Sequence, residues 1–156
     1  MVVKALVQLS VAGAATCVLV GPAQATHSLI PPNTTFQLIG KAALGPDAVV
    51  CSITMSGVTS PAGTKNVAGQ ITGASLVKPS KKCSELSFAG FPWRIRIDSK
   101  YGGSISNIDF TINGEYCHEA PVALRIFKSG DWAFSASPGC NFLGGFKSTP
   151  LVTVER

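Results

Sequence analysis

The amino-acid sequence predicts an all-β fold, a single antiparallel β-sandwich or barrel of about eight strands held by two disulfides. Three observations lead to this prediction. Apolar and polar residues alternate over short stretches, turn-forming residues separate these stretches, and four cysteines follow an N-terminal export signal. Alternation at every second residue is typical of strands with one buried face, whereas no helical period is sustained after residue 25. Strands with one apolar face each pack as a sandwich or close into a barrel.

The most regular strand pattern covers residues 93–99, which read WRIRIDS. Trp93, Ile95 and Ile97 fall on one face, and two arginines and an aspartate fall on the other. Pro92 sets the turn that enters this strand. The same alternation predicts strands over residues 34–40, 48–56, 66–77, 105–113, 121–128, 131–136 and 150–155.

Glycine, proline and asparagine mark the connections between the predicted strands. Ser129-Gly130 separates two strand patterns and predicts a hairpin. Further turns are expected at residues 45–47, 60–63, 101–103, 113–114, 137–139 and 144–145. No linker, charge block or low-complexity segment interrupts the series, so we expect one β-domain over residues 26–156.

Residues 1–25 have the three parts of a secretory signal peptide. Lys4 supplies the basic start, an apolar run follows, and Ala23-Gln24-Ala25 supplies the A-x-A end. The apolar run is short for a membrane span, which needs about 20 residues. A lipoprotein modified at Cys17 fits poorly, because Ala14 stands where a leucine is usual. We predict cleavage after Ala25 and a secreted, extracellular or cell-surface protein, with the periplasm as the alternative location.

The four remaining cysteines, Cys51, Cys83, Cys117 and Cys140, indicate disulfides, because their number is even and the chain carries an export signal. Four cysteines allow three pairings. We favour Cys51–Cys83 with Cys117–Cys140, since each bridge then closes a moderate loop beside predicted strands. The other two pairings stay open. A zinc site is not expected, because C-x-x-C is absent and the chain has only two histidines.

Composition and motifs argue against nucleic-acid binding and catalysis. The formal net charge is +5, but the basic residues are scattered and form no broad stripe with interleaved aromatics. His27 lies beside the expected cleavage site, and His118 follows a cysteine that we expect to be oxidised. The eight carboxylates fall on turns or outward strand positions, and no nucleophile elbow or metalloprotease motif occurs. We therefore expect no enzymatic activity and no metal or cofactor.

The stretch VVCSITMSGVTSPAGTKNVAGQITGASLVKPSKKCSELSFAGFPWRI resembles the core of the bacterial alkane-oxidation activator proteins. The likeness covers about residues 34–97. It depends on the order and spacing of an early cysteine in a strand, a Gly/Thr/Ser-rich stretch, a second cysteine and a Pro-Trp turn. The resemblance implies a small exported accessory protein that aids growth on alkanes by assisting contact with the oily substrate. It assigns Cys51, Cys83, Pro92 and Trp93 to the framework and names no binding residue.

Two apolar stretches are candidates for a surface that contacts hydrocarbon or cell-surface components. An exposed apolar patch of several hundred Å2 on a soluble monomer usually marks an interaction site. The alternative is that these side chains cover the two ends of the core. The candidate residues are Phe88, Phe91 and Trp93 in the first stretch and Phe142, Leu143 and Phe146 in the second.

A second function class is a structural subunit of an extracellular fibre or matrix. Exported β-domains can self-associate when one copy adds a strand to an open sheet edge of the next. The segment 26–40 could be such a donated strand, with Phe36 and Leu38 as anchors. The alternative is an ordinary first strand paired within its own sheet. A barrel that binds a small ligand is a third and weaker hypothesis.

Overall fold

A computed structural model describes residues 27–78, 80–118, 121–135 and 140–155, and the predicted signal peptide lies outside them. The described residues form β-strands connected by turns. Among them, no helix is long and apolar enough to cross a membrane. The strands are β1 (Leu29–Ile30), β2 (Thr35–Gly45), β3 (Val49–Thr59), β4 (Gly69–Leu76), β5 (Ser87–Ala89), β6 (Trp93–Ser99), β7 (Gly102–Ser106), β8 (Asp109–Ile112), β9 (Glu115–His118), β10 (Val122–Ile126), β11 (Asp131–Phe134), β12 (Asn141–Thr149) and β13 (Thr153–Val154).

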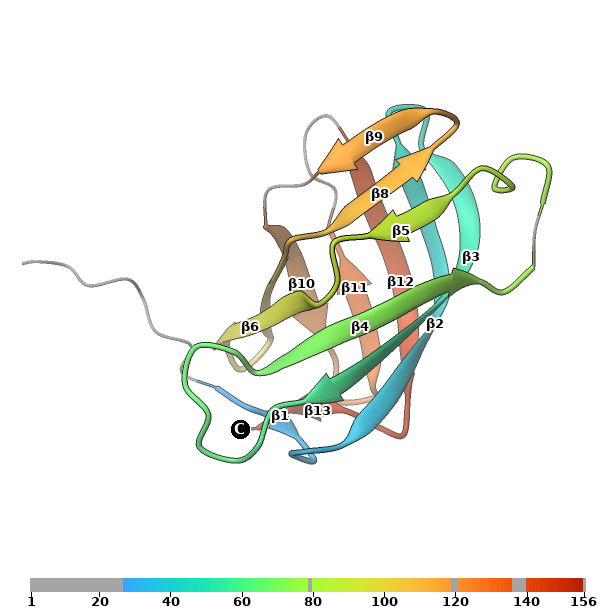
Figure 1. The fold of residues 1–156 in the computed structure, drawn as a ribbon. Coiled ribbons are helices and arrows are strands. Elements are labelled where there is room, and N and C mark those ends of the chain that lie inside the picture. The colour runs from blue at the N-terminus through green and yellow to red at the C-terminus, as the bar shows by residue number, and fades with distance from the viewer. Residues whose placement is uncertain (1–26, 79, 119–120, 136–139, 156) are drawn as a thin grey trace, which may run out of the picture.

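Eight strands close into an antiparallel barrel in the spatial order β10-β11-β12-β2-β3-β4-β6-β7 (Figure 1). The longest ladders lie around β2, which pairs with β3 from Thr35 to Leu44 and with β12 from Gln37 to Gly45. The last pairing, between β7 and β10, closes the ring. The predicted all-β class is confirmed, and of the two architectures left open by the sequence the structure has the barrel.

Two small sheets lie at opposite ends of the barrel (Figure 1). At the upper end in this view, β5, β8 and β9 form a three-stranded sheet whose Phe110 packs against Phe142 of the barrel, with 6.0 Å between the ring centroids. At the lower end, β1 pairs with β13, and Leu29 is buried beneath the barrel. These small sheets cover the ends of the hydrophobic core.

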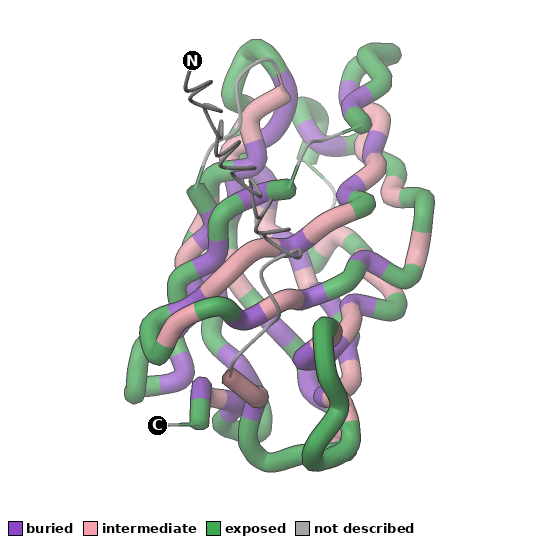
Figure 2. The backbone as a smooth tube through the Cα atoms, turned by 90° about the vertical axis from the view of Figure 1, so that its left-hand side faces the viewer, coloured by how far each residue is buried: buried purple, intermediate pink, exposed green. Residues whose placement is uncertain are grey.

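Side chains fill the barrel interior. Buried and exposed residues alternate along the strands, and this appears as the alternating colours of the tube in Figure 2. A closed barrel of about eight strands has an interior just wide enough for side chains to fill it. The largest buried side chains are Trp93, Trp132, Phe110, Phe134, Phe142, Leu29, Leu38, Leu44, Ile53, Met55, Ile71 and Ile95. The interior is therefore a packed core, and this gives no support to the hypothesis of a ligand-binding barrel.

Both disulfides have the pairing favoured from the sequence. Cys51 of β3 is bonded to Cys83, and Cys117 of β9 is bonded to Cys140, next to β12, with Cα–Cα distances of 5.9 and 5.7 Å. The first bridge attaches the loop after β4 to the barrel wall, and the second attaches the upper sheet to β12. On the loop-entropy model, each bridge stabilises the fold by about 3–4 kcal/mol.

One strand prediction and one turn prediction are wrong in a way that the backbone explains. The expected strand 105–113 is two strands, β7 and β8, which belong to different sheets. Asn107 between them has a φ of 65°, a left-handed conformation that ends the first strand. The expected turn at 144–145 instead lies inside β12. A side chain at Gly144 would contact the Lys41 carbonyl, so this glycine permits the close approach of β2 rather than a turn.

Gly40 makes a similar close approach and gives a test of the β2–β12 ladder. A Cβ atom at Gly40 would overlap the carbonyl oxygen of Gly145, whereas a Cβ atom at Gly73 of β4 would meet nothing within 4 Å. We expect Gly40→Ala to lower the free energy of unfolding by about 2–3 kcal/mol, because the backbone of β12 must move. Gly73→Ala should stay within about 0.5 kcal/mol of the wild type. Urea unfolding measures both, and equal stabilities would contradict this close approach.

Candidate functional site

The first apolar stretch predicted as a surface is mostly part of the core. Trp93 is fully buried, and its indole N–H donates a hydrogen bond of 2.8 Å to the Ala89 carbonyl. Phe91 stacks on Trp93 at 4.7 Å between centroids, and Phe88 meets the same ring edge-on at 5.9 Å. Both phenylalanines are partly buried. Trp93 therefore belongs to the core, as its position on the same face as Ile95 and Ile97 requires, and of the two alternatives for this stretch the structure favours the one in which it covers an end of the core.

The second predicted stretch divides between the two faces of β12. Phe142 and Phe146 are buried, whereas Leu143 between them is 51% exposed. Phe142 and Phe146 both meet the ring of Phe134, at 5.4 and 5.1 Å between centroids. For Phe142 and Phe146 the structure favours the alternative in which they belong to the core, and Leu143 alone of the three points outward.

Leu143 belongs to a set of exposed apolar side chains on the outer side of β12, β2 and β3. Leu143, Ala43 and Val50 are consecutive partners in the ladders of these three strands, so they form one row across the wall. Further along the barrel, Ile39 of β2 and Phe127 before β11 are also exposed. We call this set the apolar wall; its large members are Ile39, Val50, Phe127 and Leu143, which are 47%, 63%, 44% and 51% exposed.

A groove of about 390 Å3 lies on the apolar wall. Ile39 and Phe127 line its sides, and Ala133 and Gly145, which are ladder partners, lie between them. A Cβ atom at Gly145 would meet nothing within 4 Å, so the groove is open above this residue. The groove therefore offers an apolar strip to a partner that approaches from outside the barrel.

Ile39 and Val50 were missed as surface residues, although the sequence contained the signal. Phe36 and Leu38 share one face of the predicted strand 34–40, and the period of two places Ile39 on the opposite face. The same period places Val50 outside when Cys51 and Ile53 face inward. Phe127 and Gly145 could not be found this way, because their proximity depends on the pairing of β11 with β12.

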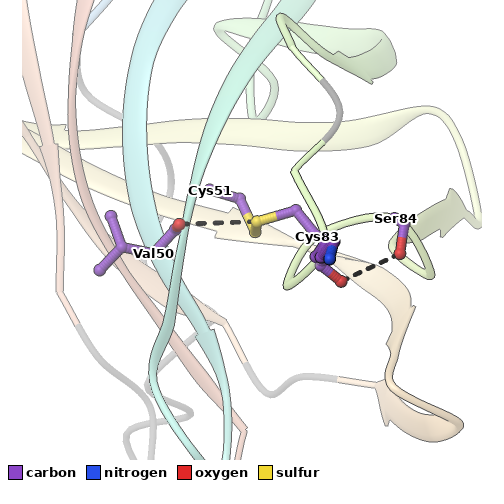
Figure 3. The surroundings of a disulfide bond; sticks show 5 residues. Val50, Cys51, Cys83 and Ser84 are labelled. Carbon is purple, nitrogen blue, oxygen red and sulfur yellow. Dashed lines mark hydrogen bonds between the residues drawn. A yellow bond between two sulfur atoms is a disulfide. The ribbon is translucent and has the colours of Figure 1, made fainter.

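The Cys51–Cys83 bridge holds a basic loop beside one end of the apolar wall. Figure 3 shows Sγ of Cys83 next to the backbone of Val50, with 3.5 Å between the sulfur and the Val50 carbonyl oxygen. Within this loop, the Ser84 hydroxyl donates to the Lys81 carbonyl at 3.1 Å. A cleft of about 650 Å3 beside the loop is lined by Val50, Lys81, Lys82 and other residues. The disulfide thus fixes cationic side chains near an exposed apolar one.

A separate polar cluster lies on the outer face of the upper sheet. Oδ2 of Asp109 accepts a hydrogen bond of 3.1 Å from the Tyr116 hydroxyl and lies 3.9 Å from Nδ1 of His118. The rings of Tyr116 and His118 are nearly parallel, at 7° and 6.4 Å between centroids. The hydrogen bond to Asp109 raises the pKa of Tyr116, and burial and the carboxylate charge add to the shift.

This cluster does not form a metal centre. Within the described part of the chain, no group of three or more His, Cys, Asp and Glu side chains could hold a metal ion. His118 is largely exposed, and the cysteine beside it is in a disulfide, so the two cannot act as a nucleophile and base. His27 lies just before β1, far along the chain from these residues.

The fold and its surface define a small disulfide-bonded β-barrel with a packed interior and an apolar outer wall. A scan against family models matches residues 1–155 to the family described as Alkane oxidation protein activator PraA/PraB-like. The chain therefore belongs to the PraA/PraB-like family of alkane oxidation protein activators. The resemblance inferred from the cysteines and the Pro-Trp turn is confirmed. Comparisons with curated proteins and with solved structures find no match.

The Asp109–Tyr116 hydrogen bond gives a pH-dependent prediction. Ionised Tyr116 can no longer donate this bond and is repelled by the carboxylate, so its phenol should stay protonated above the usual pKa of about 10. Asp109→Asn should return the pKa of Tyr116 toward that value. Because the chain has two tyrosines, both titrations use Tyr101→Phe as background and follow phenolate absorbance. Superimposable curves with and without Asp109→Asn would show that the bond does not form.

Proposed function

We propose that this alkane oxidation activator is a secreted, non-enzymatic accessory protein that adsorbs to hydrocarbon through its apolar wall. The single observation that supports this function is the gathering of Ile39, Val50, Phe127 and Leu143 on adjoining parts of the outer surface. The family description supplies the link to alkane oxidation. Adsorption through this wall would bring the protein, and any cell surface attached to it, into contact with the oily substrate.

Contact at the outer wall is favoured over enclosure because buried side chains fill the interior of the described barrel. Leu38, Ile53 and Met55 at the centre of β2 and β3 are fully buried among neighbouring side chains. Displacing such side chains would cost several kcal/mol, as core substitutions do. The groove on the apolar wall requires no displacement, since the position above Gly145 is open.

The magnitude of the contact favours an oil surface over a single dissolved alkane molecule. Each fully buried CH2 group contributes about 0.8 kcal/mol, and an open groove covers only part of each group. Binding one molecule must also offset about 4–15 kcal/mol of lost translational and rotational freedom. A droplet contacts the whole wall at once, so all four large side chains contribute. We therefore infer that a hydrocarbon phase is bound much more strongly than a single alkane molecule.

Two features support action outside the cytoplasm. The Cys51–Cys83 and Cys117–Cys140 bridges are typical of proteins that fold in an oxidising compartment. Residues 1–25 have the pattern of a secretory signal peptide, which would deliver the chain there. Alkanes partition into separate phases outside the cell, so an exported protein would meet them before uptake.

The alternative of a fibre subunit has less support. In the structure, Phe36 and Leu38 belong to β2, whose neighbours on both sides are strands of the same barrel. Donating this strand to another copy would open the barrel and expose its core. The shorter strand β1 pairs with β13 through Leu29 and Ile30. No specific observation favours assembly over adsorption.

Polar substitutions on the apolar wall test the proposal. Ile39→Ser combined with Leu143→Ser removes two side chains that are about half exposed. Full burial of such a side chain contributes about 1.5–3 kcal/mol, so each should contribute about 1 kcal/mol here, or roughly fivefold in affinity. We expect the double variant to require a roughly 25-fold higher protein concentration than the wild type for the same decrease in water–hexadecane interfacial tension. Pendant-drop measurements on purified protein with both disulfides formed provide the comparison.

A matched pair of glycine variants supplies the control. Gly145→Gln places a polar side chain in the groove, and Gly73→Gln places the same side chain at an equally open position on β4. Gly145→Gln should weaken adsorption, and Gly73→Gln should behave as the wild type does. If both variants adsorb equally, or if the wild type acts no more strongly than an inert protein of similar size, the apolar wall is not the contact surface.

A further inference from the structure

We infer that the groove on the apolar wall has a preferred ligand class, an unbranched alkyl chain that ends in a carboxylate. This inference rests on the proposed function, because it assigns a ligand to the same wall. It goes beyond adsorption to neutral hydrocarbon, since it requires recognition of a negative charge. The relevant observation is the placement of cationic side chains around the apolar strip.

Two lysines flank the groove from neighbouring strands. Lys147 of β12 lines the groove directly and is the ladder partner of Ile39. Lys41 of β2 is the ladder partner of Gly145, the open position of the groove. The two lysines are therefore diagonal neighbours on the outer face, at a separation of about 7–8 Å between Cα atoms. A carboxylate at this end of the groove would lie within reach of both ammonium groups.

The lysines are available to an external anion. Both are exposed, and within the described residues neither takes part in an ion pair of 4.0 Å or less. The neighbouring carboxylate is Asp131, the other ladder partner of Lys147, and it accepts a hydrogen bond of 2.6 Å from the Ser129 hydroxyl. Arg125 adds a further positive charge, with its guanidinium 5.9 Å from the Phe127 ring centroid. Around the groove, cations outnumber the anion.

The combination of charge and shape selects the ligand class. A small inorganic anion would satisfy the lysines but leave Ile39 and Phe127 exposed to water. A neutral alkane would cover Ile39 and Phe127 but leave the cations without a partner. A chain with a terminal carboxylate satisfies both sets of groups, and long lysine stems can pack along its methylenes while their ammonium groups reach the charged end. Complete oxidation of a terminal methyl group of an alkane produces this type of molecule.

The outer faces of β3 and β4 provide an internal contrast. On β3, the outward positions after Val50 carry hydroxyl side chains, at Ser52, Thr54 and Ser56. On β4, Thr72 and Ser75 are exposed in the same way. These strands therefore present no lysine beside an apolar groove. The cationic and apolar side chains coincide on β2 and β12, and this is the combination that an anionic amphiphile requires.

Titration with matched short-chain ligands tests the inference. The isotopically labelled protein is titrated with decanoate and with 1-decanol, both below the concentration at which they aggregate, and amide chemical shifts are followed. We expect decanoate to shift the signals of Ile39, Gly145 and Lys147 and to bind about fivefold more tightly than decanol, in line with exposed ion pairs. Lys41→Gln with Lys147→Gln should abolish this difference, whereas Lys65→Gln with Lys100→Gln should leave it intact. Added salt should weaken decanoate binding selectively.

The outcomes separate this inference from the proposed function. If decanol binds as tightly as decanoate, if the shifts lie elsewhere, or if the Lys41→Gln/Lys147→Gln variant keeps the preference, the carboxylate inference is wrong. In each of these cases the wild type can still adsorb to hexadecane, and the proposed function then stands without it. If neither ligand binds and the hexadecane interface is also unaffected, both fail. Acetate serves as a further ligand, and binding as tight as that of decanoate would show that the alkyl chain plays no part.

Discussion

Each strand of the closed barrel must turn one face toward a packed interior. Only the opposite face is therefore available for contact with other molecules. Leu38 and Ile53 fill the interior, so Ile39 must point outward from the same stretch of wall. The apolar side chains that face solvent are therefore not part of the core. They occupy outward positions, and the proposed contact with hydrocarbon depends on them.

The disulfides and the two small sheets stabilise this wall without forming it. Cys117 attaches the upper sheet to the chain just before β12, and Cys51 attaches the basic loop beside Val50. Under the proposed function the protein meets apolar surface that favours unfolding, because core side chains could leave the interior for the oil. Cross-links that restrict the unfolded chain and small sheets that cover the core ends both oppose this.

The alternation of single strands could be predicted from the sequence, whereas the assembly of those strands could not. The period of two identified the inward face of β6 and implied the outward position of Ile39. The order of strands around the barrel depends on ladders such as β7 with β10, which join residues distant in sequence. Two consecutive glycines resemble a turn, so the strand β12 was not predicted. In the structure, Gly144 allows β2 to approach closely, and Gly145 leaves the groove open. The burial of Trp93 follows from its place on the same face as Ile95 and Ile97, whereas the burial of Phe142 depends on β12, which was not predicted.

Lysines and apolar side chains lie on the same wall, so the strength of adsorption should depend on whether the oil surface carries anionic groups. An uninterrupted apolar wall would favour pairing between copies, and charged side chains on a sheet surface oppose such pairing. Lys41 and Lys147 therefore oppose pairing between copies and leave the wall free to contact oil. They also weaken the attraction of the wall for a neutral oil. If oxidation products with carboxylate ends collect at the oil surface, that weakening is offset, because the same lysines then gain partners. Affinity for a droplet would rise with the extent of its oxidation, and a protein with a purely apolar wall would not show this response.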